Sequence, residues 1–396
     1  MSDAKTETSL PVKRLRIAVL NRLFKPTGGG AERYSIALVE QLAARHEIHV
    51  FAQQIEHNFP GVRYHRVFTP FTRPRWINQI WFALATWWMT RRSFDVVHSH
   101  ENTWHGQVQT VHVLPIQYNL FKGRTGLTWA LRCLKVLTSP RLLVYIGLER
   151  LRYRITPGKC IVVTAPGLRA TMAQTFPATA SVLAVVTPGV TDVPGRCTEQ
   201  EKCAARLQLG LPEAGHCILF VGNDYRKKGL PALLQALSQL PAGRFLAVVG
   251  NADQIAEFRP QVQSLGLRDR VFFLGALSDV SVAYRAADCL AHPTLEDTFG
   301  MVVLEAMAHG LPVVVSCAEF CGIADSLTHG DNAYVLNDPR NVAHLVEALM
   351  AVLPPSIGAS GLAASAQIFA SAHLWSAQAR LQEAIYLCVA AESVRG

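Results

Sequence analysis

Short, uniformly hydrophobic runs alternate along this chain with segments whose hydrophobic positions recur every three or four residues. Runs of this kind are typical of parallel strands that are buried on both faces. The periodic segments predict amphipathic helices, as over residues 31–45, where Tyr34, Leu38 and Leu42 share one face. The predicted strands are residues 15–21, 47–53, 95–100, 159–165, 181–187, 216–222, 244–250, 270–275, 288–293 and 311–316.

Strands that alternate with helices predict an α/β fold built on doubly wound parallel sheets. The strand pattern lapses over residues 187–213, where Pro188, Gly189, Pro194 and Gly195 cluster. Such clusters mark linkers between domains. We therefore expect two Rossmann-like domains, residues 1–188 and 189–370, followed by a helical segment over residues 371–396.

The composition favours a folded protein of the cytoplasm. Half of the 396 residues are hydrophobic and 17% are charged, which argues against disorder. No stretch reaches the roughly 20 apolar residues of a membrane span, and the polar start lacks a signal-peptide core. Cys317 and Cys321 are separated by three residues, but the chain has no second such pair of cysteines to complete a metal site, so we expect no bound metal.

The net charge of +9 is unevenly distributed. Residues 1–190 hold 24 Lys and Arg against 9 Asp and Glu, whereas residues 191–396 hold 14 against 20. A basic N-terminal half points to an anionic partner such as phospholipid, a phosphorylated saccharide or nucleic acid. A solvated basic surface without a partner is the alternative. No recognised nucleic-acid-binding module is present, so we expect no nucleic-acid partner.

Residues 76–92 combine four tryptophans with a basic end. Such a segment suits the interface between membrane and water. It equally suits a helix buried in the N-terminal domain, because aromatic side chains also pack well in a core. The pattern alone leaves both interpretations open.

Two groups of polar residues follow predicted strands of the second half. Doubly wound sheets bind ligands beyond the carboxyl ends of their strands. Arg226, Lys227 and Lys228 lie on a loop that opens a helix at Gly229, an arrangement that suits a diphosphate. Three solvated cations on a surface loop are the alternative.

Glu305 lies in a helical segment between hydrophobic neighbours. A carboxylate in such surroundings needs a partner, because burying it alone is costly. Two ribose hydroxyls would fit as partners, and so would an Arg or Lys from elsewhere in the chain.

Histidines and glycines are the candidates of the first half. His98, His100, His105 and His112 occur around strand ends, without the spacing of a helical zinc site. A core histidine bonded to a backbone carbonyl is the plainer interpretation of His112. The triplet Gly28, Gly29 and Gly30 could place backbone N–H groups against a phosphate or sugar, or form an ordinary turn.

Several segments together resemble the family 4 glycosyltransferases of the GT-B fold. HPTLEDTFGMVVLEAMAHGLPVV (residues 292–314) resembles their E-x7-E signature, and FVGNDYRKKGLPALLQAL (220–237) resembles their diphosphate-binding loop. GGGAER (28–33), QTVHV (109–113), VVTPGV (185–190) and HLWSAQARLQEAIY (373–386) resemble further family segments in the same order. The resemblance implies two Rossmann-like domains that face each other across a cleft, with a C-terminal helix that crosses back to the first.

The resemblance also implies a retaining transfer of a hexose from a nucleotide sugar, without a cofactor or a metal. The leaving diphosphate would take the acceptor proton. Glu305 would hold the ribose hydroxyls, Lys228 the diphosphate, and His112 would lie near the hexose. The implied catalytic residues are His112, Lys228 and Asp297, and the implied donor-binding residues are Gly28, Gly29, Gly30, Asn223, Lys227, Lys228, Asp297, Phe299, Gly300 and Glu305.

Within the family, the GNDYRKKG loop and the FCGIA run (320–324) resemble glucosyltransferases of the lipopolysaccharide core. This subgroup implies a UDP-hexose donor, a lipid-linked or lipopolysaccharide acceptor, and a peripheral position on the anionic cytoplasmic face of the inner membrane. The chain departs from the family at two positions, where Asp297 replaces a Glu and Asn223 replaces an Arg. It departs from the subgroup at His112, which stands where the core glucosyltransferases have an acidic residue. Alternatives are a sugar-nucleotide epimerase on the same fold and a catalytically silent membrane-bound scaffold.

Overall fold

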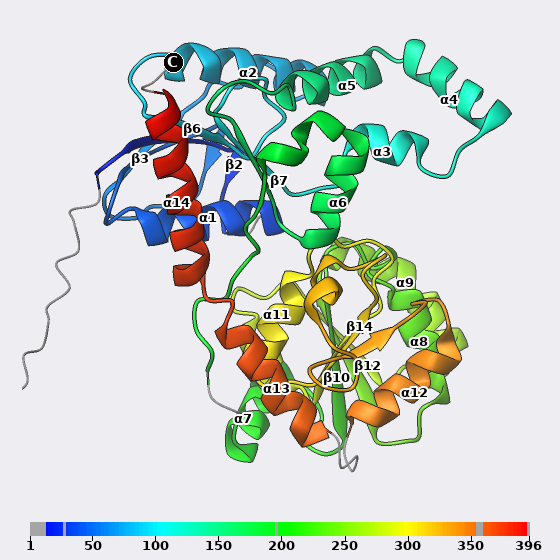
Figure 1. The fold of residues 1–396 in the computed structure, drawn as a ribbon. Coiled ribbons are helices and arrows are strands. Elements are labelled where there is room, and N and C mark those ends of the chain that lie inside the picture. Colours follow the sequence, from blue (N-terminus) through cyan, green and yellow to red (C-terminus); the bar gives the residue numbers. More distant parts are fainter. Residues whose placement is uncertain (1–12, 27–28, 195–196, 354–358, 394–396) are drawn as a thin grey trace, which may run out of the picture. The chain divides into compact units, whose positions relative to one another are not determined.

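The computed structural model describes residues 13–26, 29–194, 197–353 and 359–393. The chain forms two compact units (Figure 1). Unit 1 comprises residues 1–163, 171–184 and 379–396, and unit 2 comprises residues 164–170 and 185–378. Gly28 of the glycine triplet lies outside the described residues. In the described part of the chain, no helix is both long and apolar enough to span a membrane.

Unit 1 is built on a seven-stranded sheet in the order β5-β3-β1-β6-β7-β8-β9. The registered pairs from β5 to β8 are all parallel. Its core strands are buried and mostly hydrophobic, because helices cover both faces. The strands are β1 (Arg16–Leu20), β3 (Glu47–Ala52), β5 (Val62–Arg66), β6 (Val96–Ser99), β7 (Val108–Val111), β8 (Cys160–Val163) and β9 (Leu183–Val185), with a separate pair β2 (Leu23–Phe24) and β4 (Gln54–Ile55).

The helices of unit 1 include a group that lies along one side of it, formed by α2, α4 and α5 (Figure 1). The C-terminal part of α14 also packs in this unit. The Tyr386 hydroxyl forms a 2.6 Å hydrogen bond with His98 Nδ1, and Glu383 accepts a 2.9 Å bond from His46 Nε2. The helices are α1 (Gly30–Leu42), α2 (Arg75–Thr90), α3 (Ile116–Phe121), α4 (Gly126–Leu137), α5 (Pro140–Arg152), α6 (Pro166–Thr175) and α14 (Trp375–Ser393), with α6 and α14 shared between the units.

Unit 2 is built on a six-stranded parallel sheet in the order β12-β11-β10-β13-β14-β15. The strands are β10 (His216–Gly222), β11 (Arg244–Gly250), β12 (Val271–Gly275), β13 (Cys289–His292), β14 (Val313–Ser316) and β15 (Tyr334–Leu336). The helices are α7 (Glu199–Leu209), α8 (Leu230–Gln239), α9 (Ile255–Ser264), α10 (Ser281–Ala286), α11 (Met301–Ala308), α12 (Val342–Val352) and α13 (Ala359–Ser371). Each sheet therefore has the doubly wound α/β architecture that the sequence predicts.

Both sheets reverse their winding direction beside a central strand. In unit 2 this switch lies between β10 and β13, and in unit 1 it lies between β1 and β6. Ligands of open α/β sheets bind at the carboxyl edge beside such a switch, because the two adjacent loops leave in opposite directions. The loops that follow β10 and β13 are those of Lys228 and Asp297.

The helix α2, which covers residues 76–90 of the tryptophan-rich segment, has mainly polar side chains on its buried face. Asn78 exchanges two hydrogen bonds with Gln53, at 2.8 and 2.9 Å, and Thr86 and Thr90 bond to carbonyls within the helix. Phe82 and Ala83 are the apolar members of this face. The tryptophans lie on the other side, so a helix buried as a whole is ruled out. Five large hydrophobic residues of this helix are exposed, from 39% for Trp81 to 64% for Trp88.

Candidate functional site

A compact site forms in unit 2 where the loops after β10 and β13 meet. Lys228 donates a 2.6 Å hydrogen bond to Asp297 Oδ2 and a 3.1 Å bond to the Glu296 carbonyl. The two loops are also joined through the backbone, because the Leu295 amide donates to the Lys227 carbonyl at 2.8 Å. The site thus brings together two predicted residues that are 69 positions apart in the sequence.

Glycine makes this close approach possible. Gly229 has φ +84°, and a Cβ at this position would lie 1.9 Å from the Pro293 carbonyl oxygen. No side chain can replace its hydrogen without separating the two loops. Gly300, the N-cap of α11, also has a positive φ, +97°. A Cβ at this position would lie 2.7 Å from Cys321 Sγ. Gly300 therefore fixes where the second loop ends.

Asp297 lies between two donors. Besides Lys228, the His292 ring Nε2 lies 3.1 Å from Asp297 Oδ2. Burial acts to raise the pKa of Asp297, but the hydrogen bond with His292 and the charge of Lys228 outweigh it and hold that pKa well below its usual range. Burial lowers the pKa of His292, and the hydrogen bond with Asp297 opposes that shift. The ring donates from Nε2, because a carboxylate can only accept. The Asp297 side chain remains a charged carboxylate at the edge of the sheet.

The backbone of the Asp297 loop is fixed by a neighbouring segment. Its amide donates to the Phe320 carbonyl at 2.7 Å, and its carbonyl accepts from the Gly322 amide at 3.0 Å. The Phe299 amide lies 3.3 Å from Asp297 Oδ1. Phe299, a predicted donor-binding residue, is only 6% exposed, and its carbonyl accepts from the Ile323 amide at 2.7 Å.

Three other polar residues of the loop over residues 223–229, Asn223, Arg226 and Lys227, face solvent. Lys227 pairs with Glu296 at 3.0 Å, and both side chains are about half exposed. Arg226 forms an ion pair with Glu257. Asn223 is exposed, and its carbonyl accepts from Gln254. Lys228 is therefore the cation of this loop that the structure directs to Asp297.

Glu305 has the partner that its apolar neighbours require. The Tyr284 hydroxyl donates to Glu305 Oε2 at 2.8 Å, and the Tyr284 ring stacks on His309 with 5.0 Å between centroids. Glu305 is partly exposed, one and a half turns into α11 from Gly300. Its carboxylate can accept hydrogen bonds from a ligand while Tyr284 orients it.

A second polar cluster lies in unit 1 beside the β1–β6 switch. His112 Nε2 lies 2.9 Å from His100 Nδ1 and the two rings stack, while the Tyr34 ring meets His112 edge-on. The partner of His112 is thus a second histidine, where a backbone carbonyl was the plainer expectation. Burial lowers the pKa of His98 and of His112 to about 3, so both rings are neutral at neutral pH.

The glycine loop precedes this cluster in the chain. Gly30 begins α1 and Gly29 is its N-cap, without a hydrogen bond from a capping side chain. Both glycines are exposed. The first amides of α1 are therefore suited to an anion, as at other helix N-termini.

The sequence interpretation missed three residues that shape the site: His292, Tyr284 and Tyr225. Tyr225 is buried, and it anchors the lysine loop through ring contacts with Phe220 and Phe258. The position of His292 at the end of a buried strand, five residues before Asp297, was a signal that could have identified it. Within the described residues, no group of three or more His, Cys, Asp or Glu side chains is placed to hold a metal ion.

Comparison with known families agrees with this geometry. Residues 202–356 match the family described as glycosyl transferases group 1, and residues 28–192 match glycosyltransferase family 4. The chain belongs to the GT-B glycosyltransferases. In this GT-B glycosyltransferase, the match to the group 1 family covers most of unit 2, including Lys228, Asp297 and Glu305. The match to family 4 includes His112 of unit 1.

Similar proteins include several glycosyltransferases. Lipopolysaccharide glucosyltransferase WaaG of Escherichia coli is 34% identical over 155 residues, which are 38% of this chain and 41% of WaaG. The D-inositol 3-phosphate glycosyltransferase of Xylanimonas cellulosilytica is 34% identical over 181 residues, 42% of each protein. The matched part thus spans about two fifths of these curated relatives. An uncharacterized glycosyltransferase of Methanocaldococcus jannaschii is 24% identical over 80% of this chain and 84% of its own.

Solved structures show the same fold. The crystal structure of WaaG superposes with a TM-score of 0.80 at 22% identity, covering 93% of this chain and 99% of that one. Anabaena HepE in complex with UDP-glucose has a TM-score of 0.71 at 19% identity, covering 94% and 99%. At these identities the likeness concerns the fold, two parallel-sheet α/β domains of the GT-B type.

Proposed function

We propose that this GT-B glycosyltransferase transfers a hexose from a UDP-sugar to a saccharide acceptor, with retention at the anomeric carbon. The observation that carries the proposal is the pairing of Lys228 with Asp297 at the carboxyl edge of unit 2, with Glu305 on the helix that follows. In this arrangement a cation can bind the diphosphate of the donor. An ionised acid can bind its hexose, and a second acid can bind its ribose. The complex of HepE with UDP-glucose supports a donor of this class.

In the proposed reaction, Lys228 turns from Asp297 to the diphosphate when the donor binds. The bond from the anomeric carbon to the diphosphate oxygen breaks, and a bond to the acceptor oxygen forms on the same face. The acceptor proton passes to the diphosphate. Lys228 stabilises the charge that develops there, an electrostatic contribution that is often the largest in catalysis. Asp297 holds hexose hydroxyls. Within unit 1, His112 and the first amides of α1 stay candidate contacts for a hexose and a phosphate.

The test uses the full-length protein with UDP-glucose and other UDP-hexoses, each with and without a saccharide acceptor. We expect an acceptor-dependent product one hexose heavier by mass spectrometry, and NMR should show the anomeric configuration of the donor. An epimer of the donor formed without acceptor, or an inverted product, would contradict the proposal. Comparing the mass of lipopolysaccharide from a deletion strain and its parent tests the lipopolysaccharide acceptor.

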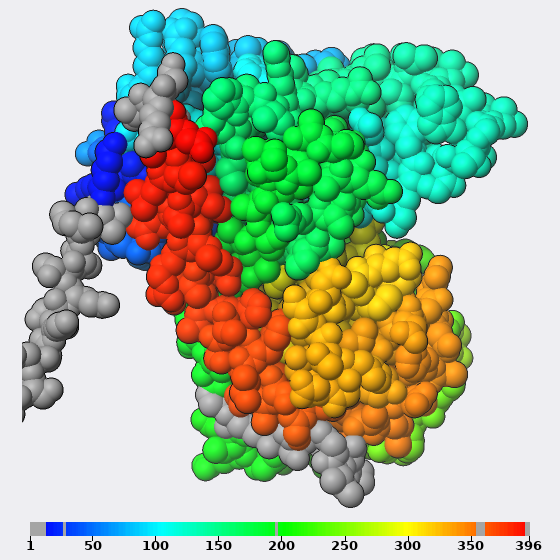
Figure 2. Space-filling model, in the orientation of Figure 1, coloured from blue at the N-terminus to red at the C-terminus, as the bar shows by residue number. Residues whose placement is uncertain are grey.

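We further propose that unit 1 binds the anionic cytoplasmic surface of the inner membrane. Residues 68–154 hold 12 Arg and Lys against 3 acidic residues. Over the same segment hydrophobic side chains lie exposed on α2 and α4, which project along one side of the unit (Figure 2). They are Trp81, Leu84, Trp87, Trp88 and Met89 on α2, and Leu127, Trp129, Leu131, Leu134 and Leu137 on α4.

Exposed apolar helices flanked by cations are typical of interfacial binding. Trp88 is 64% exposed and Leu127 is 75% exposed, so neither supports the core. The double variant Trp88→Glu with Leu127→Glu should lose sedimentation with anionic vesicles while it stays folded. Leu207→Glu is the matched control, because Leu207 is 72% exposed in unit 2. Equal sedimentation of the wild type with anionic and neutral vesicles would defeat this proposal.

A further inference from the structure

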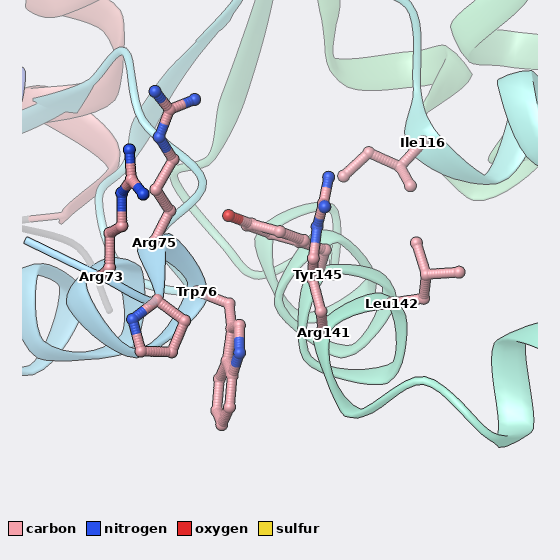
Figure 3. A pocket seen from close by; sticks show the side chains of 8 residues that line it. Arg73, Arg75, Trp76, Ile116, Arg141, Leu142 and Tyr145 are labelled. Atoms are coloured by element: carbon pink, nitrogen blue, oxygen red, sulfur yellow. The ribbon is translucent and has the colours of Figure 1, made fainter.

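A cavity of about 650 Å³ lies in unit 1 between the start of α2 and the first turns of α5. Arg73 and Arg75 lie on one side of it and Arg141 on the other, with the Tyr145 hydroxyl pointing into the space between them (Figure 3). Trp76 and Leu142 provide apolar walls. The cavity thus combines three guanidinium groups with an apolar lining, and its volume is in the range of small-molecule sites.

No acidic side chain lines this cavity. Among the described residues, the side chains of Arg73, Arg75 and Arg141 form no ion pair or hydrogen bond, and all three residues are exposed. Other arginines of the same unit are paired, such as Arg22 with Glu101 at 3.0 Å and Arg45 with Glu383 at 2.6 Å. Three unpaired like charges around one space repel one another, and a bound anion would remove that repulsion.

The position of these arginines in their helices is unfavourable without an anion. Arg75 is the first residue of α2 and Arg141 the second residue of α5, and neither helix has an acidic residue in its first turn. The partial positive charge of a helix N-terminus favours anions and disfavours cations. Both helix starts therefore add to the positive potential of the cavity instead of offsetting it.

We infer that this cavity binds a phosphate group carried on a sugar or glycerol body. Guanidinium groups match phosphate oxygens in bidentate geometry, which favours phosphate over a carboxylate of lower charge. The Trp76 ring and Leu142 pack against the body, and Tyr145 donates to an oxygen of it. None of these residues belongs to the proposed donor site, so binding here can be measured whether or not transfer takes place.

Calorimetric titration of the full-length protein tests the site. The probes are inorganic phosphate, glucose 6-phosphate and monomeric dihexanoyl phosphatidic acid, with glucuronate as a carboxylate control. We expect the two phosphate esters to bind at least about tenfold more tightly than glucuronate. Tighter binding of glucose 6-phosphate assigns the phosphate to a saccharide, and tighter binding of phosphatidic acid assigns it to a lipid headgroup.

The variant Arg73→Gln, Arg75→Gln, Arg141→Gln should lose about a hundredfold or more in affinity for the phosphate esters. Its matched control is Arg92→Gln, Arg132→Gln, Arg150→Gln, which removes the same charge from α4, α5 and the end of α2. The unliganded cavity variant should be at least as stable as the wild type, because it removes cations from two helix starts. Unchanged affinity in the cavity variant, an equal loss in the control, or glucuronate binding as tight as that of the esters would overturn the inference.

Discussion

Replacing Asp297 by alanine removes the acceptor that Lys228 and His292 share in unit 2. The bonds are 2.6 and 3.1 Å long, and the Asp297 and Lys228 side chains are 20% and 21% exposed. His292 is fully buried, and its Nδ1 already has no hydrogen-bond partner among the described residues. The ring would therefore lose the bond at Nε2 without water to replace it.

The cost can be estimated from these contacts. Leaving a buried ring donor unsatisfied costs about 1–3 kcal/mol. The lost ion pair adds about 1 kcal/mol, because Lys228 keeps the Glu296 carbonyl and can be hydrated. Asp297→Ala should thus lower the free energy of unfolding by about 2–4 kcal/mol. Glu296→Ala removes only the half-exposed pair with Lys227 and should cost less than about 1 kcal/mol.

The effect on transfer should follow the same order. We expect Asp297→Ala to lower kcat/KM by about a hundredfold or more, since it removes a preorganised charge, and Glu296→Ala to lower it by less than about threefold. Asp297→Asn separates the two effects, because an amide oxygen still accepts from His292 but carries no charge. Its stability should lie closer to the wild type while its activity stays low.

Urea unfolding at pH 7 and steady-state transfer with one donor and one acceptor measure both quantities. If Glu296→Ala proved more damaging to kcat/KM than Asp297→Ala, the assignment of the first acid would be wrong. If Asp297→Ala unfolded at the same urea concentration as the wild type, the network with His292 and Lys228 would contribute nothing. Activity unchanged in both variants would mean that neither side chain contacts the hexose.

Three further predictions concern other contacts. Glu305→Gln should weaken UDP-sugar binding about tenfold or more with little change in stability, measured by calorimetry, and unchanged affinity would exclude the ribose role. Gly229→Ala should destabilise by several kcal/mol in urea, because its Cβ would overlap the Pro293 carbonyl at φ +84°, and a mild effect would contradict that contact. Burial lowers the pKa of His112 to about 3, whereas the unfolded chain has a pKa of about 6.5 for this ring. The stability that the neutral ring gives the fold is therefore fully present above pH 6.5. Below that pH the free energy of unfolding falls by up to about 1.4 kcal/mol per pH unit until the pH reaches the folded-state pKa. His112→Asn should flatten this decline in urea titrations between pH 6.5 and 4, and an unchanged slope would refute it.

Most strands of the two central sheets could be predicted from the sequence to within a few residues. The predictions for residues 216–222 and 244–250 coincide with β10 and β11. These strands are buried on both faces, so the five positions after the polar first residue of each are hydrophobic and the run has clear ends. The strands β5, β7 and β15 were missed. β5 and β15 lie at the edges of their sheets, where polar residues are tolerated, and β7 carries two polar residues, Gln109 and Thr110, within only four.

The sequence also placed Lys228 and Asp297 on loops that follow strands, and their family resemblance gave them roles. That they meet was decided by the strand order, which makes β10 and β13 neighbours although β11 and β12 lie between them in the chain. The approach of the two loops depends on Gly229, whose missing side chain leaves room for Pro293. A local pattern does not carry this information.

The same limit applies to residues 76–92 and to Phe299. The aromatic pattern predicted a helix, but it could not say which face is buried, because Asn78 and Gln79 find hydrogen-bond partners only in distant segments, at Gln53 and Asn102. Phe299 lies in the predicted donor loop, yet its side chain turns into the core. The sequence by itself determined which segments are buried strands and which loops carry charge, because those depend on neighbouring residues. The tertiary structure decided which side chains are hydrogen-bond partners, which face of α2 is buried, and that a cationic cavity lies between α2 and α5. These features depend on contacts between residues far apart in the chain.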